Sequence, residues 1–467
     1  MRLRLGVSMV ALAATLSLPA LAACPQQSGG EEQGQTSPPA SAGSEKEAAG
    51  GLPHLSGPES IAPGTTSPEH SYFFPSFQIF GLADSHSTVT SGPQRFESIE
   101  TAVLGLAGES VGKHSRAIAD YQGGVLLYNR HSGLDATEHQ VGLNWSYQGR
   151  RWGWALDERA NYLPESAFGY PGFGWRGALG TDLGGATGSN LGSLNPNFDP
   201  NQVLFSSRGS RIVNGTAAEV QYATSPRSSL SVSGAFGMLT FRTPGSIDST
   251  NELITVAYNH SLSRRDFASV SYGMNVFQFR PVGESFKVHS IDFSYGHRIR
   301  GKLAIGVGGG PQFAVFGSPI FGSSVTATWV GHGSVAWNTP SNAFTLSAMR
   351  YTTNGGGVLA GTIADQFQIN WSPRLSRKWS GSLGPGYARN TSLPQTILAG
   401  QSATYDSVYA QASLSRAFGH NTNMFVNYTF QGQSSRTACL AGNCNASLSR
   451  HVLSLGFAWH RRQIVLE

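Results

Sequence analysis

The chain has 467 residues, and only 13% of them are charged, whereas soluble domains carry about 25%. Together with the 58 glycines, this disfavours a string of ordinary soluble domains. The formal net charge is +5 and the pI is about 9.1, but the basic residues are scattered through turns, so no surface for nucleic acid is indicated.

Residues 1–23 have the pattern of a secretory signal peptide. Arg2 and Arg4 form the basic start, and an apolar stretch runs from Leu5 to Ala20. That stretch is too short for a spanning helix, and no later stretch approaches the length of one. We therefore predict export of the mature chain.

The cleavage site fits two kinds of processing. Ala20-Leu21-Ala22 suits ordinary signal peptidase, whereas Leu21-Ala22-Ala23-Cys24 resembles the lipobox of bacterial lipoproteins. The sequence favours lipidation of Cys24, and cleavage to a plain N-terminus is the alternative. Residues 24–70 follow and are rich in Pro, Gly, Ser, Glu and Gln. Such a segment buries too little apolar surface to offset its ordering entropy, so we predict a disordered linker.

From about residue 72 onward, apolar side chains alternate with small or polar ones. In the last such run, the apolar series is Leu453, Leu455, Phe457 and Trp459, and Ser454, Gly456 and Ala458 lie between its members. A period of two indicates strands with one apolar face. Because the other face is too small and polar for a dry core, we predict that residues 71–467 form one closed antiparallel transmembrane β-barrel.

Short turns and longer connections alternate along this region. The predicted turns are basic and polar, at 148–151, 225–228, 263–266, 298–302, 338–342 and 375–378. The longer connections are predicted at 129–137, 242–250, 279–285, 313–323, 352–358, 390–403 and 431–448. This is typical of outer-membrane barrels, with short periplasmic turns and longer external loops. Both termini should be periplasmic, which requires an even strand number, so we predict about eighteen strands, with sixteen as the alternative.

One connection is much longer than the others, from about residue 164 to 211. It is rich in glycine and aromatic residues and has no periodicity. A loop of this length is usually functional or disordered. It either folds back into the barrel as a constriction or lies on the surface.

The two remaining cysteines, Cys439 and Cys444, lie close together near the end of the chain. An exported chain meets an oxidising compartment, so a small disulfide at a loop tip is predicted. No metal or other cofactor is predicted, since no His or carboxylate stands beside this pair.

The C-terminal strand resembles the recognition strand of bacterial outer-membrane β-barrel proteins. That strand presents Leu455, Phe457 and Trp459 on one face, although the chain continues through HRRQIVLE. The resemblance implies insertion by the barrel-assembly machinery and a porin-like protein, with outer-membrane lipid and small solutes as its partners. It does not indicate a substrate or an oligomeric state.

Enzymatic chemistry is not predicted. His332 beside Ser334 and His289 beside Ser290 are the nearest approaches to a nucleophile with a base, and neither has a recognisable third member in the sequence. The glycines at 306–310 are not followed by a helix start, so a phosphate site is not indicated.

Several charged residues fall in the predicted inward phase and would tune ion selectivity. They are Asp120, Asp157, Arg159, Glu219, Asp292 and Asp365. Because their signs are mixed, no strong preference for cations or anions is expected.

Two functional hypotheses remain. The first is a porin-like passive channel for small solutes. The second is a non-conducting surface barrel whose long loops, 164–211 and 431–448, bind partners. The assigned faces predict that Val256→Arg and Phe293→Arg impair assembly, whereas Thr255→Arg and Ser294→Arg are tolerated.

Overall fold

The structure, a computed structural model, describes the barrel region of the chain from Ser71 onward. The described residues are 71–85, 96–130, 135–163, 210–242, 246–280, 285–299, 302–318, 322–339, 341–355, 359–393, 403–419, 421–439, 442–443, 446–460 and 464–466. The signal peptide, the linker, Cys24 and nearly all of the long connection at 164–211 lie outside these residues. Their assignments therefore stay predictions.

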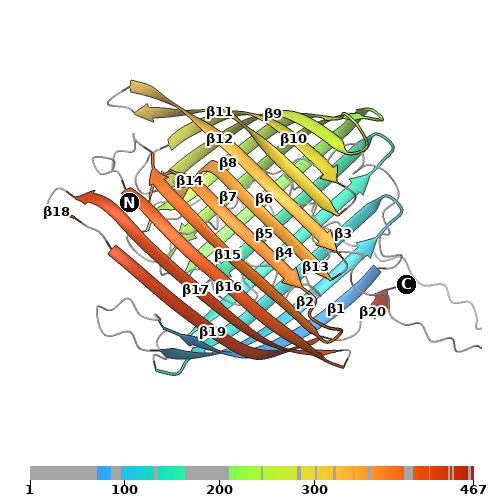
Figure 1. Ribbon diagram of the computed structural model, residues 1–467, viewed down its shortest axis with the longest axis vertical. Helices are drawn as coiled ribbons and strands as arrows, with labels where there is room; N and C mark the ends of the chain where they lie inside the picture. The colour runs from blue at the N-terminus through green and yellow to red at the C-terminus, as the bar shows by residue number, and fades with distance from the viewer. Residues whose placement is uncertain are drawn as a thin grey trace, which may run out of the picture. The chain divides into compact units, whose positions relative to one another are not determined.

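Eighteen long antiparallel strands form one sheet that closes on itself, because the first strand pairs with the last long one (Figure 1). The long strands are β1 (Ser71–Asp84), β2 (Glu97–Val111), β3 (Ser115–Tyr128), β4 (Ala136–Gln148), β5 (Trp152–Leu163), β6 (Arg211–Ser225), β7 (Ser228–Phe241), β8 (Asp248–Ser261), β9 (Asp266–Arg280), β10 (Ser285–Ile299), β11 (Leu303–Ser318), β12 (Gly322–Thr339), β13 (Asn342–Thr353), β14 (Thr362–Pro373), β15 (Trp379–Ser392), β16 (Ala403–Phe418), β17 (Thr422–Cys439) and β19 (Ala446–His460). The predicted fold class is confirmed, and the alternative of sixteen strands is wrong.

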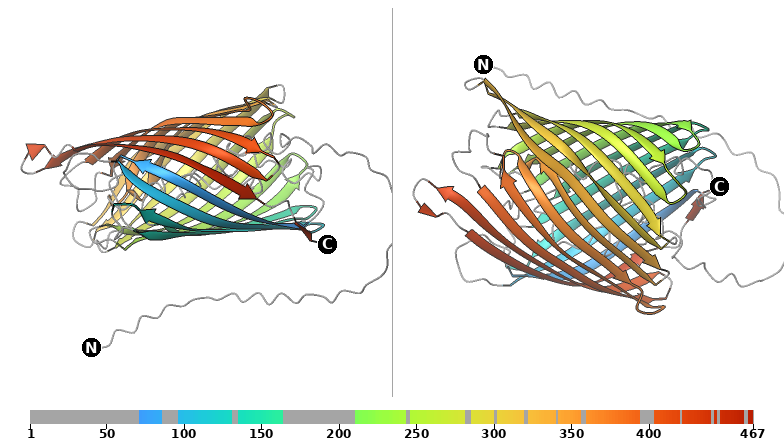
Figure 2. Two further views of the ribbon diagram at one scale, coloured as in Figure 1. Left: turned by 90° about the horizontal axis from the view of Figure 1, so that it is seen from below. Right: turned by 45° about the horizontal axis from the view of Figure 1, so that its top comes forward.

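The barrel closes between β1 and β19. Their register runs from Ser76 opposite His460 to Asp84 opposite Val452, and Figure 2 shows these two strands side by side. Closure leaves no free sheet edge along this seam, as a membrane requires.

Two short strands complete the sheet. β18 (Gly442–Asn443) pairs with the end of β17, and β20 (Ile464–Leu466) pairs with the first residues of β1. The tail beyond His460 thus returns to the barrel as an extra strand. Cys439 ends β17, but its side chain and Cys444 lie outside the described residues, so the disulfide stays a prediction.

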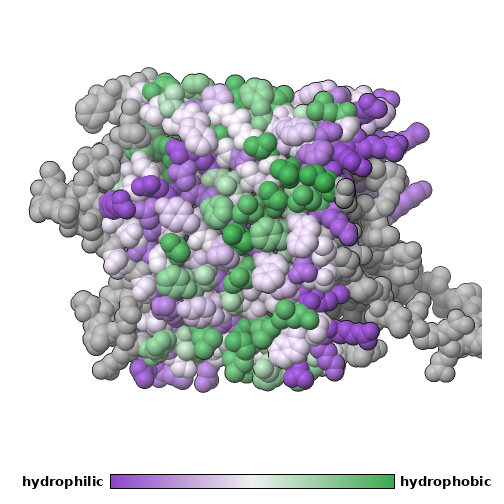
Figure 3. All heavy atoms as spheres, in the orientation of Figure 1, coloured by the Kyte–Doolittle hydropathy of each residue, from purple (hydrophilic) through white to green (hydrophobic). Residues whose placement is uncertain are grey.

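The outer face carries the apolar phase of each strand. Leu453, Leu455 and Phe457 are exposed on β19, whereas Ser454 and Gly456 between them are buried. The same alternation places Val256 and Phe293 outside on β8 and β10. Figure 3 shows apolar residues across the middle of one face and hydrophilic residues toward both ends. An apolar belt of this extent suits hydrocarbon and not water, so the barrel is of the outer-membrane, membrane-spanning type.

The two ends of the barrel differ. One end, the turn end, carries the connections 112–114, 149–151, 226–227, 262–265, 300–302, 340–341, 374–378 and 419–421; the opposite end, the loop end, carries the remaining ones. β1 starts and β19 finishes at the turn end.

Two predicted loops are shorter than expected. β11 continues to Ser318 and β17 continues to Cys439, so 313–318 and 431–439 are strand. Gln431, Gln433 and Ser435 face inward in β17, where polar side chains are permitted. These polar inward side chains explain why the sequence predicted a loop in this part of β17. None of the described residues belongs to a helix long and apolar enough to cross a membrane.

Candidate functional site: the barrel interior

Small, uncharged polar side chains line much of the inner face. They are most regular on β7 to β9, where the inward positions include Ser229, Ser231, Ser233, Asn259, Ser269 and Ser271. Hydroxyl and amide groups attract neither sign of charge strongly. This part of the wall is therefore polar and uncharged, and its side chains are buried.

Four of the predicted inward charges lie on neighbouring strands, β3 to β6. Asp120 and Arg159 face each other across Gly142 of β4. A Cβ at Gly142 would lie 2.5 Å from a carboxylate oxygen of Asp120, so the glycine leaves room for that carboxylate. Arg159 Nε lies 3.0 Å from Asp157 Oδ1, and Glu219 lies close by on β6, opposite Ala155. Opposite charges are thus gathered on one sector of the wall.

Asp292 lies on a different sector, in a cluster with Ser294 and His332. The hydroxyl of Ser294 donates a hydrogen bond to Asp292 Oδ1 at 2.5 Å. His332, on β12, places Nε2 3.3 Å from Ser294 Oγ and Nδ1 3.6 Å from Asp292 Oδ2. Gly308 of β11 lies between them in the sheet, where a Cβ would be 2.5 Å from both His332 and Ser294. Only glycine at that position lets the three side chains meet.

This cluster has the residue types of a catalytic triad but a different arrangement. In an activated serine, the histidine takes the hydroxyl proton and the carboxylate holds the far side of the imidazole. Here the Ser294 hydroxyl donates its hydrogen bond to Asp292 and not to the histidine, so Ser294 is not aligned as a nucleophile. His332 approaches Ser294 instead of Ser334, and His289 lies on the outer face, where its Nδ1 is 2.8 Å from the hydroxyl of Tyr272.

Asp365 lies on the outer face, unlike the other predicted charges. It shares the phase of the exposed Phe367 and pairs with Arg350, whose Nη1 is 2.7 Å from Oδ1. Arg350 also stacks on Trp329, 4.7 Å from the ring centroid, and Trp329 is exposed on the outside. The prediction that Asp365 faces the barrel interior was therefore wrong.

Sequence reasoning missed several inward charges. Asp84 and Arg450 form a buried ion pair across the β1–β19 seam, and Glu109 pairs with Arg116 near the turn end. The buried Arg211 also faces inward, from the start of β6. The alternation contained the signal for all of them, but the pairings depend on strand neighbours that the sequence does not reveal.

The β13–β14 hairpin bends into the barrel toward the loop end. β12 and β13 pair only as far as Gly331 opposite Arg350, whereas β13 and β14 remain paired to Thr353 opposite Thr362. Beyond Arg350 the hairpin therefore separates from β12 and stays intact as a hairpin.

Two hydrogen bonds hold the bent hairpin against the inner wall. Thr352 Oγ1 donates to Gln312 Oε1 of β11 at 2.8 Å, and Asn354 Nδ2 donates to Ser249 Oγ of β8 at 3.0 Å. All four side chains are buried. The hairpin therefore crosses the inner face of β12 and reaches the wall beyond it.

An apolar cluster lies under the hairpin. We call it the inner apolar cluster, and it consists of Ile247, Phe277, Phe279, Phe286, Val288, Ala314, Phe316, Ala360 and Leu393, with Ile363 packed against it. Gly361 has a φ of 89°, and a Cβ there would lie 2.5 Å from the ring of Phe286. Glycine thus permits both the turn and the close approach. Burial of this cluster stabilises the bent position of the hairpin.

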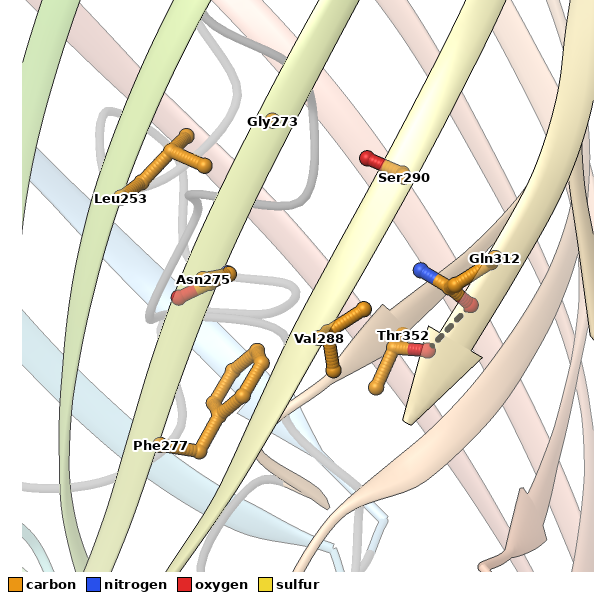
Figure 4. Close-up of a pocket in the computed structure, with 8 residues that line it drawn as sticks. All are labelled: Leu253, Gly273, Asn275, Phe277, Val288, Ser290, Gln312 and Thr352. Atoms are coloured by element: carbon orange, nitrogen blue, oxygen red, sulfur yellow. Dashed lines mark hydrogen bonds between the residues drawn. The ribbon is translucent and has the colours of Figure 1, made fainter. Parts of the chain in front are cut away.

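A small cavity remains beside the hairpin (Figure 4). Its lining comes from β8 to β11 and from β13: Leu253, Gly273, Asn275, Phe277, Val288, Ser290, Gln312 and Thr352. The lining has amides and hydroxyls but no charged group. On this side, neutral groups therefore narrow the interior of the barrel. The charged side chains of β3 to β6 lie on another sector of its wall. Across the described ranges, no three potential metal ligands gather.

The fold resembles that of solved outer-membrane proteins at low sequence identity. The outer-membrane protein OpdK of Pseudomonas aeruginosa is 10% identical, with 83% of this chain and 99% of that chain covered and a TM-score of 0.43. OccK2 from the same organism, solved with glucuronate, is 10% identical over 84% of this chain and 98% of that chain, with a TM-score of 0.43. OpdQ is 11% identical over 85% and 99%, with a TM-score of 0.42. No protein-family model and no curated protein matches this chain.

Proposed function

We propose that the protein is a passive channel of the bacterial outer membrane for small water-soluble solutes, with the turn end in the periplasm. The carrying observation is the closed barrel of eighteen strands with an apolar outer belt and an inner wall that includes many small polar side chains. Barrels of 16–18 strands are wide enough to leave an aqueous channel. The bent β13–β14 hairpin would set the size limit near the loop end.

Single-channel recording tests this proposal directly. Refolded protein in a planar bilayer should give discrete conductance steps. The refolded fraction is checked by its heat-modifiable mobility in SDS gels. Folded protein that leaves the bilayer silent would contradict a passive channel.

Removing the hairpin tip should widen the channel. In a variant with residues 354–361 replaced by Asn-Gly, a two-residue turn joins Thr353 directly to Thr362. The bond to Ser249 and the contribution of Ala360 are then lost. We expect the conductance to rise about twofold, because the narrowest part of a pore dominates its resistance. Unchanged conductance would mean that the constriction lies elsewhere.

A matched pair of point variants tests the hydrogen bond between Asn354 and Ser249. Asn354→Ala and Ser249→Ala remove the same hydrogen bond from opposite sides. Each should increase current fluctuations, and the double variant should behave like either single one because the two residues are coupled. Additive effects would show that the bond does not hold the hairpin.

Ion selectivity should be weak. Asp157 and Arg159 neutralise each other on the wall of β5, and the lining of the cavity is uncharged. The reversal potential in a salt gradient should therefore remain close to zero. A strongly selective channel would require an uncompensated ring of charge.

The second hypothesis, a non-conducting surface barrel, has lost one of its two motivating loops. Residues 431–439 form strand, so the connection after β17 is short. The hypothesis now depends on the connection at 164–211. Deletion of that connection should abolish adhesion if it binds a partner and should raise conductance if it obstructs the channel.

A further inference from the structure

The outer face of β15 to β17 changes sharply from apolar to charged toward the loop end. On β16 the outward residues between Arg416 and Asp406 are apolar: Leu414, Ala412, Ala410 and Val408. Ten residues of strand, at about 3.3 Å each and tilted by about 40°, cross about 25 Å, which is the height of the apolar belt of such barrels. Arg416 and Asp406 thus mark the two edges of the belt, and Asp406 lies at the loop-end edge.

Two arginines flank Asp406 at this edge. Arg389 of β15 places Nε 3.5 Å from Asp406 Oδ1, and Arg436 of β17 places Nη2 3.8 Å from Oδ2. The carboxylate is already occupied by the hydroxyl of Tyr387, which donates to Oδ1 at 2.6 Å. Asp406 therefore positions both guanidinium groups but does not use up their capacity to donate hydrogen bonds.

Most donors of these two arginines point to the surroundings. The side chains of Arg389 and Arg436 are 45% and 71% exposed, whereas Asp406 is 16% exposed. Neither arginine has another partner within the described part of the chain. Two positive charges against one negative charge leave the group with a net charge of +1. It is thus an anion-binding arrangement at the level where lipid headgroups lie.

We propose that Arg389 and Arg436 bind the phosphate of an anionic lipid headgroup in the outer leaflet. A phosphate offers several oxygens that guanidinium forks bind in pairs, and such charge-assisted bonds are about twice as strong as neutral ones. Asp406 acts as a positioning residue, since it holds the two forks close together. The lipid chains would lie along Val408 and its apolar neighbours on the belt.

Retention of lipid by the purified barrel tests the proposal. The full chain in a neutral detergent is mixed with diphosphorylated lipid A, and the bound lipid is counted by native mass spectrometry. The wild type should retain the lipid, and Arg389→Gln with Arg436→Gln should weaken retention about tenfold, because two charged donors are lost. Arg280→Gln is the matched control, since Arg280 is also an exposed arginine on the outer phase at the loop end of a strand.

Two further binding measurements make the result decisive. A phosphate-free glycolipid of the same chain length should not be retained, and inorganic phosphate should compete only at high excess. Equal retention by the wild type and the double variant, when both are folded, would overturn the proposal. Displacement by inorganic phosphate at low concentration would also overturn it, because the site would then bind the free anion.

Discussion

Replacing Arg450 with methionine should strongly destabilise the barrel. The Arg450 guanidinium donates to both carboxylate oxygens of Asp84, with Nη2 2.5 Å from Oδ2 and Nε 3.0 Å from Oδ1. The two side chains are 2% and 1% exposed. Removing one partner leaves an uncompensated buried charge, which costs about 3–5 kcal/mol. We expect a corresponding fall in the free energy of unfolding, measured by urea titration of protein refolded into vesicles.

The double variant separates the charge penalty from simple loss of packing. Arg450→Met combined with Asp84→Leu removes both charges and keeps similar volumes, which is often neutral for a buried pair. It should regain most of the lost stability. Arg280→Met, at an exposed end of β9, should change the free energy of unfolding little. If the double variant is as unstable as the single one, the ion pair is not the cause.

The strands themselves were readable from the sequence because the alternation is local. The first strand, β1, follows this alternation, since Phe77 and Ile79 lie on its outer face and Gln78 between them is buried. The even strand number followed from the expectation that both termini lie on the same side of the membrane, and the antiparallel pairing of β1 with β19 agrees with it. Where neither phase carries large apolar side chains, as at 431–435 in β17, the local signal failed and strand was taken for loop.

The error at Asp365 shows the limit of reading single residues. It has the same parity as Phe367 and Ile369, so the outer placement was present in the sequence. A carboxylate was not expected on an apolar face because its partner, Arg350, becomes a neighbour only when β13 and β14 pair.

Contacts across several strands were not predictable at all. Asp84 and Arg450 are 366 residues apart and meet only when the barrel closes. The Ser294–His332 contact bridges β10 and β12 across Gly308. The bend of the β13–β14 hairpin likewise depends on packing against inward phenylalanines that belong to other strands. Locally, the glycines at 355 and 361 mark the turn at its tip, where both have a positive φ.

The prediction for Ser294→Arg also changes. Ser294 is 8% exposed, is bonded to Asp292 and lies beside His332. An arginine there would displace both Asp292 and His332, so tolerance is no longer expected. Thr255, which faces inward from β8 and is only half-buried, remains the suitable inner control.

Arginine on the outer belt should block assembly. Phe293 is 59% exposed on the outer face, in the middle of β10, and Val256 has the same orientation in β8. A charge at the membrane midplane costs about 2–4 kcal/mol, because no water reaches it there. We expect Phe293→Arg and Val256→Arg to reduce the fraction of folded barrel in vesicles, scored by heat-modifiable mobility. Thr255→Arg, one residue from Val256 on the opposite face, should fold nearly as well as the wild type. Equal losses at Thr255 and Val256 would contradict the assignment of the two faces, since only their orientation distinguishes these neighbours.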